Sequence, residues 1–338
     1  MTTPALVRAP DAHAPPEALG GSRDDVALLV AWRGSGELEH GRFRELRRFL
    51  AAGDLLVVNT SATLPAALSG RVDGLAVELH LSTPAADGDW IVELRTSDRG
   101  RFGRPPIGAL VELPAGASAH LLAPYAGGSR LCVARLSVPK PLEEYLRDHG
   151  HPIRYQYADD AWPIDAYQTV FALDPGSAEM PSAGRPFSAE LVTALVARGV
   201  LLAPVTLHTG VSSLERGERP HPERYRVPAP TAQLANAVHG WGGRVIAVGT
   251  TVVRALETVA EPDGSIAPGA GVTDLIVTPE RGLTAIDGLL TGWHEPDSSH
   301  LDLLEAAAGA ELLERSYRAA HAHGYRWHEF GDSHLILP

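Results

Sequence analysis

One segment near the middle of the sequence combines backbone and side-chain groups that could hold an anion. It spans Gly243–Glu257 and reads GRVIAVGTTVVRALE, a pattern that predicts a short apolar strand, a tight turn and a helix. The turn residues Gly249, Thr250 and Thr251 would present N–H groups and two hydroxyls at a helix N-terminus, where carboxylates and phosphates bind. Arg254 could bind the same anion. The segment has neither a Walker A lysine nor a G-x-G-x-x-G pattern, so a purely structural turn is the alternative interpretation.

Histidines close to acidic residues form a second group of candidates. His208 lies in LLAPVTLHTGVSSL at the end of an apolar strand, where an imidazole could transfer protons or could serve only the structure. Glu223 follows in PHPERYRVP, and TGWHEPDSSH contains His294 and His300. The spacing of these groups matches no zinc motif, so we expect no metal site. The sequence contains no G-x-S-x-G motif, which argues against a serine hydrolase that uses this nucleophile motif.

Other polar residues lie in predicted loops, where α/β proteins commonly bind ligands. They follow a buried strand, occur in AYQTVFAL and in a Ser-Ala-Gly loop, or lie near the C-terminus in GYRWHEFGDSHLIL. The candidate ligand-binding residues in these loops are Asn59, Tyr167, Gln168, Thr169, Ser182, Gly184 and Asp332.

Two kinds of structure must position these candidates. Apolar strands are expected at Val26–Trp32, Leu55–Val58, Leu201–His208, Val245–Val248, Leu275–Val277 and Leu335–Leu337. Helices are expected at Ala189–Ala197, Ala232–Trp241, Val252–Val259, Leu301–Ala308 and Glu311–Ala320, with a further amphipathic helix through Phe43, Leu46, Phe49 and Leu50.

The pattern of apolar and polar residues changes between about Leu68 and Val138. Short alternating runs, separated by Gly, Pro, Asp and Ser, predict a small β-barrel there. We therefore predict an α/β fold with a discontinuous α/β catalytic domain over residues 1–67 and 139–338 and an inserted β-barrel domain over residues 68–138. Residues 1–21, rich in Pro and Ala, are expected to form a loose arm.

The bulk composition limits the functions that the chain can have. The chain has 338 residues and a net charge of −12, so the protein is not expected to bind nucleic acid over a broad face. This net charge does not exclude a local basic patch. The single cysteine, Cys132, excludes an intrachain disulfide and a cysteine-based metal centre. The N-terminus lacks the apolar core of a signal peptide, and no run approaches the roughly 18 apolar residues that span a membrane. We expect a cytoplasmic protein without membrane contacts.

In this order, the segments resemble the S-adenosylmethionine:tRNA ribosyltransferase-isomerase family of queuosine biosynthesis. The resemblance runs from about Gly36 to the C-terminus and is carried by GDLLVVNTSATLPAAL, AYQTVFALDPGSAEMPSAGRPFS, VTLHTG, GGRVIAVGTTVVRALET, TDLIV, LLTGWHEP and GYRWHEFGDSHLIL. It implies a large α/β barrel-like domain interrupted by a small β-barrel. The residue pattern predicts the same interruption independently.

The resemblance also implies a reaction. Family members use S-adenosylmethionine as a ribosyl donor: a base removes a C5′ proton acidified by the sulfonium, adenine and methionine leave, and the rearranged ribosyl unit ends on the amine of 7-aminomethyl-7-deazaguanine in tRNA. The expected partners are S-adenosylmethionine as cosubstrate and tRNA, with no cofactor. His208 would transfer the proton, and Glu223 and His294 would complete the catalytic group. Thr250, Thr251 and Arg254 would hold the methionine carboxylate or ribose hydroxyls, and Tyr167 and Gln168 would contact adenine.

The chain departs from the family pattern in several loops. Asn59-Thr60-Ser61-Ala62 stands where Asn-Asp-Thr-Arg is usual, and Arg185-Pro186-Phe187 stands where Leu-His-Phe is usual. These changes leave two alternatives to the tRNA reaction. One is a reaction of S-adenosylmethionine with a small-molecule acceptor or a rearrangement of its own, and the other is an inactive protein that binds a nucleoside. The sequence does not indicate an oligomeric state.

Overall fold

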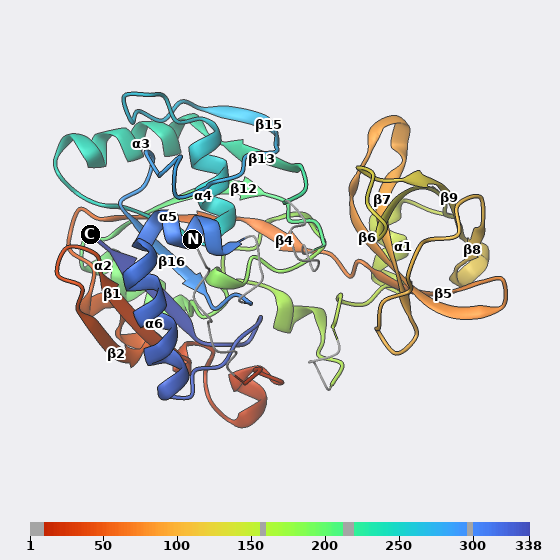
Figure 1. Ribbon diagram of the computed structural model, residues 1–338, viewed down its shortest axis with the longest axis horizontal. Coiled ribbons are helices and arrows are strands. Elements are labelled where there is room, and N and C mark those ends of the chain that lie inside the picture. Colours follow the sequence, from red (N-terminus) through yellow and green to blue (C-terminus); the bar gives the residue numbers. More distant parts are fainter. Residues whose placement is uncertain (1–9, 156–159, 212–219, 296–299) are drawn as a thin grey trace.

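The computed structural model describes residues 10–155, 160–211, 220–295 and 300–338. Within this part of the chain, the strands form a nine-stranded mixed sheet, a closed six-stranded barrel and a two-stranded sheet. The barrel lies at one end of the long axis of the molecule, apart from the helices that surround the large sheet (Figure 1). The predicted α/β class with an inserted β-barrel is confirmed.

The large sheet brings four parallel strands together at its centre. In sheet order its strands are β15 (Gly269–Thr273), β13 (Glu223–Val227), β12 (Leu201–Leu207), β3 (Leu55–Asn59), β14 (Val245–Val248), β16 (Gly288–Gly292), β17 (Ser333–Leu337), β1 (Ala27–Trp32) and β2 (Leu38–Arg42). Strands β12, β3, β14 and β16 pair in parallel, so their carboxyl ends meet at one edge. The loops that leave this edge are the natural place for a site.

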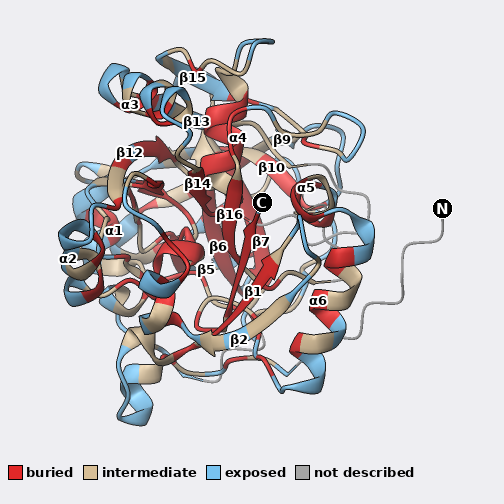
Figure 2. Cartoon of the chain, turned by 90° about the vertical axis from the view of Figure 1, so that its left-hand side faces the viewer, coloured by how far each residue is buried: buried red, intermediate tan, exposed pale blue. Residues whose placement is uncertain are grey.

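Alternation along the strands divides the core into two layers, because successive side chains point to opposite faces of a sheet. In β3, Leu55 and Val57 pack with four helices: α3 (Ala229–Gly240), α4 (Thr250–Thr258), α5 (His300–Ala308) and α6 (Ala310–Ala322). Leu56 and Val58 face the other layer, which contains α2 (Ala189–Ala197) and the 3₁₀ helix η3 (Phe43–Arg48). The central strands are accordingly buried, while exposed residues lie on the outer surfaces of α3 and α6 (Figure 2).

The barrel is built from consecutive antiparallel strands. Its strands, in order around the barrel, are β10 (Leu131–Ser137), β7 (Trp90–Thr96), β6 (Leu75–Pro84), β5 (Ala67–Val72), β8 (Leu110–Glu112) and β9 (Ser118–Pro124). It has its own apolar core, to which α1 (Leu142–His149) adds Tyr145 and Leu146. The short strands β4 (Ser61–Thr63) and β11 (Asp174–Ser177) pair in parallel with each other.

Three local predictions are wrong. Leu275–Val277 is not a strand. The Leu275 carbonyl accepts a hydrogen bond from Arg254 and its N–H donates to Thr273, so side chains replace strand partners. The segment around Phe43 and Leu46 buries the expected side chains but forms a 3₁₀ helix that ends after Arg48. Nor is the described part of the N-terminal arm loose, since Ala12 and Pro10 exchange backbone hydrogen bonds with Trp327.

None of the helices in the described ranges is both long and apolar enough to cross a membrane.

Candidate active site

A cavity of about 310 Å³ opens at the carboxyl edge of the parallel strands. Its wall is assembled from the loops after β11, β12, β14 and β16, together with the segment before β17. The wall residues with polar or aromatic side chains include Tyr155, Glu179, Ser182, Thr209, His221, Glu223, Thr250, Thr251, Arg254, Thr291, Trp293, His294, Glu295, His300, His328 and Glu329. The cavity therefore gathers segments that are more than 170 residues apart in the chain.

The N-terminus of α4 faces this cavity through Gly249, Thr250 and Thr251. Gly249 has a φ of 98°, a backbone conformation that other residues rarely adopt, and an added Cβ would lie 3.3 Å from the Ala183 Cβ. Glycine thus permits the sharp turn from β14 into the helix. Asn59 fixes the turn from behind: its side-chain amide donates to the Leu207 carbonyl (2.8 Å) and to Thr251 Oγ1 (3.3 Å).

Arg254 and Glu223 form a buried ion pair in the cavity wall. The Arg254 guanidinium also donates to the carbonyls of His221 and Thr273 (3.2 Å each) and of Leu275 (3.1 Å). Glu223 accepts a further bond from the Gly210 N–H at 2.9 Å. Burial raises the pKa of Glu223, while the Arg254 charge opposes this shift. Since its donors are directed to protein acceptors, Arg254 holds three loops together rather than presenting an open fork to a ligand.

Two stacked imidazoles also lie in the wall. The rings of His294 and His300 are 4.6 Å apart and nearly parallel, and His294 Nε2 lies 3.1 Å from Thr291 Oγ1. Burial lowers the pKa of His300 to about 4 and holds that of His294 well below its usual range. Both rings are therefore neutral at physiological pH and able to accept a proton.

The adjacent Trp293 is 4% exposed, and in the described part of the chain its indole Nε1 has no hydrogen-bond partner. Its ring stacks on His334, with centroids 4.7 Å apart and an interplanar angle of 9°.

The structure brings about half of the sequence-predicted site residues to the cavity wall. Those in the wall are Glu223, His294, Ser182, Gly249, Thr250, Thr251 and Arg254. Those outside the wall are His208, Asn59, Tyr167, Gln168, Thr169, Gly184 and Asp332. Several residues of the last group bond to the surrounding backbone. For example, Gln168 bonds both backbone groups of Thr63, and Asp332 accepts from the N–H groups of Ala27 and Arg326.

His208 lies just behind the cavity, next to the wall residue Thr209. Its Nδ1 is 2.7 Å from Ser61 Oγ, and Ser61 Oγ is in turn 2.6 Å from Ser177 Oγ. Burial lowers the pKa of His208, and the charge of Arg224 adds to the effect. The ring is also packed against Gly176, where an added Cβ would lie 2.5 Å from Nδ1. These contacts position the histidine within the protein.

The two departures from the family pattern near Asn59 and Gly184 lie outside the cavity wall. Thr60 is hydrogen-bonded to Thr206 and to the Val205 carbonyl. Arg185 is buried, donates to both carboxylate oxygens of Glu17 (2.9 and 3.1 Å) and lies over the ring of Phe330. Both replacements therefore belong to the packing around the site. The loop residues 212–219 and the residues 296–299, which follow Glu295, lie outside the described residues.

Several wall residues were not singled out from the sequence. Tyr155, Glu179, His328 and Glu329 come from loops whose partners are distant in the chain. The only signal for His328 was the polar, aromatic segment GYRWHEFGDSHLIL, in which Asp332 was singled out instead.

Comparison with known proteins shows the family to which the chain belongs. A family model described as "Queuosine biosynthesis protein" matches residues 6–336. A protein of Symbiobacterium thermophilum named S-adenosylmethionine:tRNA ribosyltransferase-isomerase is 37% identical over 327 residues, covering 93% of this chain and 94% of its own. One of the same name from Geobacter sulfurreducens is 36% identical, covering 98% of this chain and 100% of its own.

A crystal structure of an S-adenosylmethionine tRNA ribosyltransferase from Thermotoga maritima aligns with a TM-score of 0.52 at 28% identity, covering 100% of this chain and 98% of that one. The matches extend over both the large sheet and the barrel. The chain belongs to the queuosine biosynthesis protein family.

Proposed function

We propose that this protein is an S-adenosylmethionine:tRNA ribosyltransferase-isomerase. In this proposal it transfers and rearranges the ribosyl unit of S-adenosylmethionine onto 7-aminomethyl-7-deazaguanine in tRNA and releases adenine and methionine. The names of relatives that match nearly the whole chain support the activity. The observation that supports placing this activity here is the cavity at the α4 N-terminus. Its wall contains the turn at which we expect an anion to bind, neutral imidazoles and several carboxylates.

The charge of the cavity suits a cationic donor. Among the described wall residues, Glu179, Glu295 and Glu329 add carboxylates beyond the Arg254–Glu223 pair. Opposite charges within a low-dielectric cavity attract strongly, so this wall favours the sulfonium and the ammonium of S-adenosylmethionine. The methionine carboxylate would bind at Gly249, Thr250 and Thr251, where the helix N-terminus offers N–H groups.

The imidazole of His294 is the group that we assign to proton removal from C5′. It lies in the wall, next to the space that a substrate would fill, and burial keeps its ring neutral before the reaction. The neighbouring ring of His300 and the hydroxyl of Thr291 orient it. Asn59, Glu223 and Arg254 act as positioning residues, because they hold the turn and the surrounding loops in place.

The proposal is tested by incubating the purified protein with S-adenosylmethionine, with and without tRNA that bears the aminomethyl base, and measuring adenine and methionine. Release that depends on this tRNA is the expected result. Release without tRNA would instead favour a small-molecule reaction, and failure to bind S-adenosylmethionine in calorimetry would refute both. His294→Ala should lower the rate of adenine release by roughly 10²–10⁴-fold, whereas His208→Ala should have a smaller effect.

A further inference from the structure

The β-barrel contributes a side chain to the cavity wall. Tyr155 packs in the apolar core of the barrel and also lines the cavity. Its hydroxyl donates a hydrogen bond to Glu179 Oε1, and Glu179 lines the same wall. The two residues come from different loops, one after α1 and the other after β11. The phenol therefore links the barrel to a carboxylate of the site.

Buried charged groups of the barrel hold the ring of Tyr155 in place. The Arg95 guanidinium lies over this ring, 5.2 Å from its centroid, and Arg95 Nη2 is 2.9 Å from Glu93 Oε1. The imidazole of His80 meets the same ring at an interplanar angle of 81°. Burial, together with the negative charges of Glu179 and Glu93, holds the pKa of Tyr155 well above its usual value. The hydroxyl therefore stays protonated and acts as a donor.

The backbone of Glu179 is fixed as well. Thr209 Oγ1 donates to the Glu179 carbonyl, and the Ala178 N–H donates to the Thr209 carbonyl at 2.7 Å. Glu179 thus has a defined position in the wall, because Thr209 holds its main chain and Tyr155 holds its side chain. A neutral phenol orients a carboxylate without neutralising its charge.

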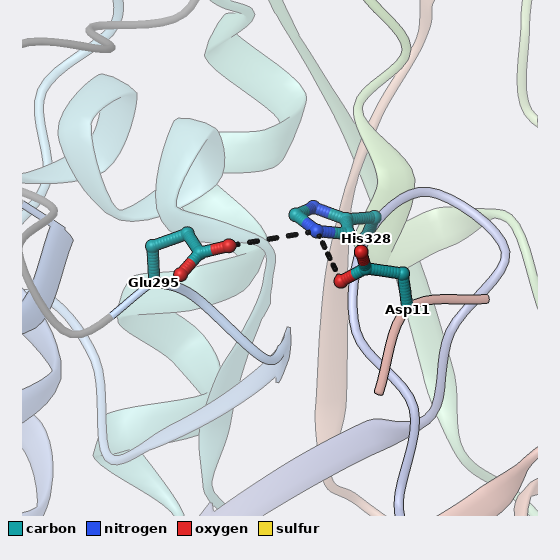
Figure 3. Close-up of side chains that lie close together, drawn as sticks. All are labelled: Asp11, Glu295 and His328. Carbon is teal, nitrogen blue, oxygen red and sulfur yellow. Dashed lines mark hydrogen bonds and ion pairs between the residues drawn. The ribbon is translucent and has the colours of Figure 1, made fainter. Parts of the chain in front are cut away.

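Two other carboxylates of the wall are in contact with basic side chains. Glu223 forms the ion pair with Arg254. Glu295 extends toward His328, with its Oε1 3.6 Å from the imidazole Nε2 (Figure 3). The phenol contact distinguishes Glu179 from these two residues, because the donor in this contact carries no charge.

The position of Glu179 suits one charged atom of the donor. Residues 179–183 all line the cavity, and Ala183 at the end of this run lies against Gly249. In the proposed function, the methionine carboxylate binds at the Gly249 turn and C5′ faces His294. The sulfur, which is bonded to C5′ and linked to the carboxylate by the methionine side chain, must lie between them. A sulfonium carries no N–H or O–H, so its attraction to a carboxylate is Coulombic and needs no vacant hydrogen-bonding position.

We propose that the Glu179 carboxylate faces the sulfonium charge of S-adenosylmethionine, and that Tyr155 is the positioning residue that directs this carboxylate toward it. The inference rests on the proposed function, because that function supplies the donor. The barrel thereby takes part in binding the donor through a side chain of its own core.

The test compares calorimetric affinities for S-adenosylmethionine and for S-adenosylhomocysteine, which lacks the sulfonium charge but keeps the adenosine, the ammonium and the carboxylate. The wild-type protein should prefer S-adenosylmethionine. Glu179→Gln should reduce this preference roughly tenfold, because it removes the opposing charge. Tyr155→Phe changes no charge and keeps the ring against Arg95, and it should reduce the preference roughly threefold. The double variant should lose no more than Glu179→Gln alone, because the phenol acts through the carboxylate.

Two substitutions serve as matched controls. Tyr145 is also buried in the barrel core, and its hydroxyl donates to the Pro114 carbonyl at 2.9 Å, but it is not among the described wall residues. Tyr145→Phe should therefore leave the preference unchanged. Asp302→Asn, at an exposed acid on α5, controls for the loss of one negative charge from the protein.

The outcomes separate the inference from the function on which it rests. Equal weakening of both ligands in Glu179→Gln, an unchanged or greater preference in Tyr155→Phe, or additive losses in the double variant overturn the inference. The proposed function stands in these cases if the wild-type protein releases adenine with the tRNA. If the preference and its losses appear but no adenine is released, the inference stands and the proposed function fails. A wild-type protein that binds neither ligand overturns both. Thermal unfolding of each variant checks that the fold is kept.

Discussion

Replacement of Arg254 by Met should destabilise the protein through the carboxylate that it leaves behind. The Arg254 and Glu223 side chains are 8% and 13% exposed, so the pair is largely removed from water. Breaking a buried ion pair by removing one partner costs about 3–5 kcal/mol, because the remaining charge is uncompensated. Arg254→Met should therefore lower the free energy of unfolding by about this amount in urea titrations. Arg318→Met, which breaks an exposed pair with Glu314 on α6, should cost under about 1 kcal/mol.

The pH dependence of the free energy of unfolding shows whether the uncompensated charge of Glu223 causes the loss of stability in Arg254→Met. Burial already raises the pKa of Glu223 above its ordinary 4.5, and Arg254 opposes that shift. In the variant without Arg254, the pKa of Glu223 in the folded protein rises further. At every pH above 4.5, folding must then either protonate this carboxylate or bury its uncompensated charge, and both oppose folding. The difference in the free energy of unfolding between wild type and variant should be small near pH 4.5. It should grow as pH rises to the pKa of Glu223 in the folded variant, and stay constant above that pH.

A double-mutant cycle completes the test. Glu223→Gln removes the charge and keeps an oxygen for the Gly210 N–H. Combined with Arg254→Met, it should recover about 1.5–3 kcal/mol, the typical contribution of a charge-assisted hydrogen bond. A coupling energy near zero, or a loss that does not vary with pH, would refute this reasoning. In that case the contacts of Arg254 with the carbonyls of His221, Thr273 and Leu275 would account for the whole effect.

Three further predictions concern stability and the turn. The His334 nitrogens have no partner among the described residues, and burial lowers the pKa of this side chain from 6.5 to about 3. His334→Phe should therefore stabilise the protein by about 1–3 kcal/mol in urea titrations at pH 7. The variant should also lose less stability than wild type as pH falls from 6.5 towards 3. Gly249→Ala should cost about 1–2 kcal/mol because of its φ of 98°, and calorimetry should show weaker S-adenosylmethionine binding. The pKa of Glu93 is lowered to about 2 although burial opposes this, because His80 and Arg130 stabilise the charge. The stability that the ionised carboxylate contributes is lost as pH falls from 4.5 towards 2. Glu93→Gln should therefore make unfolding, monitored by circular dichroism, depend less on pH in this range. Unchanged curves for these variants would contradict the assignments.

Much of the fold could be predicted because it depends on local periodicity. Val245–Val248 and Ala189–Ala197 have the predicted bounds, and the barrel strands lie in the region between about Leu68 and Val138 where the alternating runs occur. The segment Leu275–Val277 was mistaken for a strand because its apolar residues resemble one. Its hydrogen bonds go instead to Arg254 and Thr273, which only the folded chain brings close. The division into domains at residues 1–67 and 139–338 and at 68–138 remains a prediction.

The sequence by itself determined the strand–turn–helix at Gly249, because a glycine followed by two threonines between an apolar strand and a helix encodes that geometry locally. It could not determine which histidine faces the cavity. His208 and His294 both follow strands closely, yet His208 is packed against Gly176 and Ser61, while His294 lies in the wall. Nor could it bring Asp11 to His328, since 317 residues separate them in the chain. Such contacts depend on the order and direction of strands in the sheet and on where each loop crosses its edge, which only the tertiary structure decides.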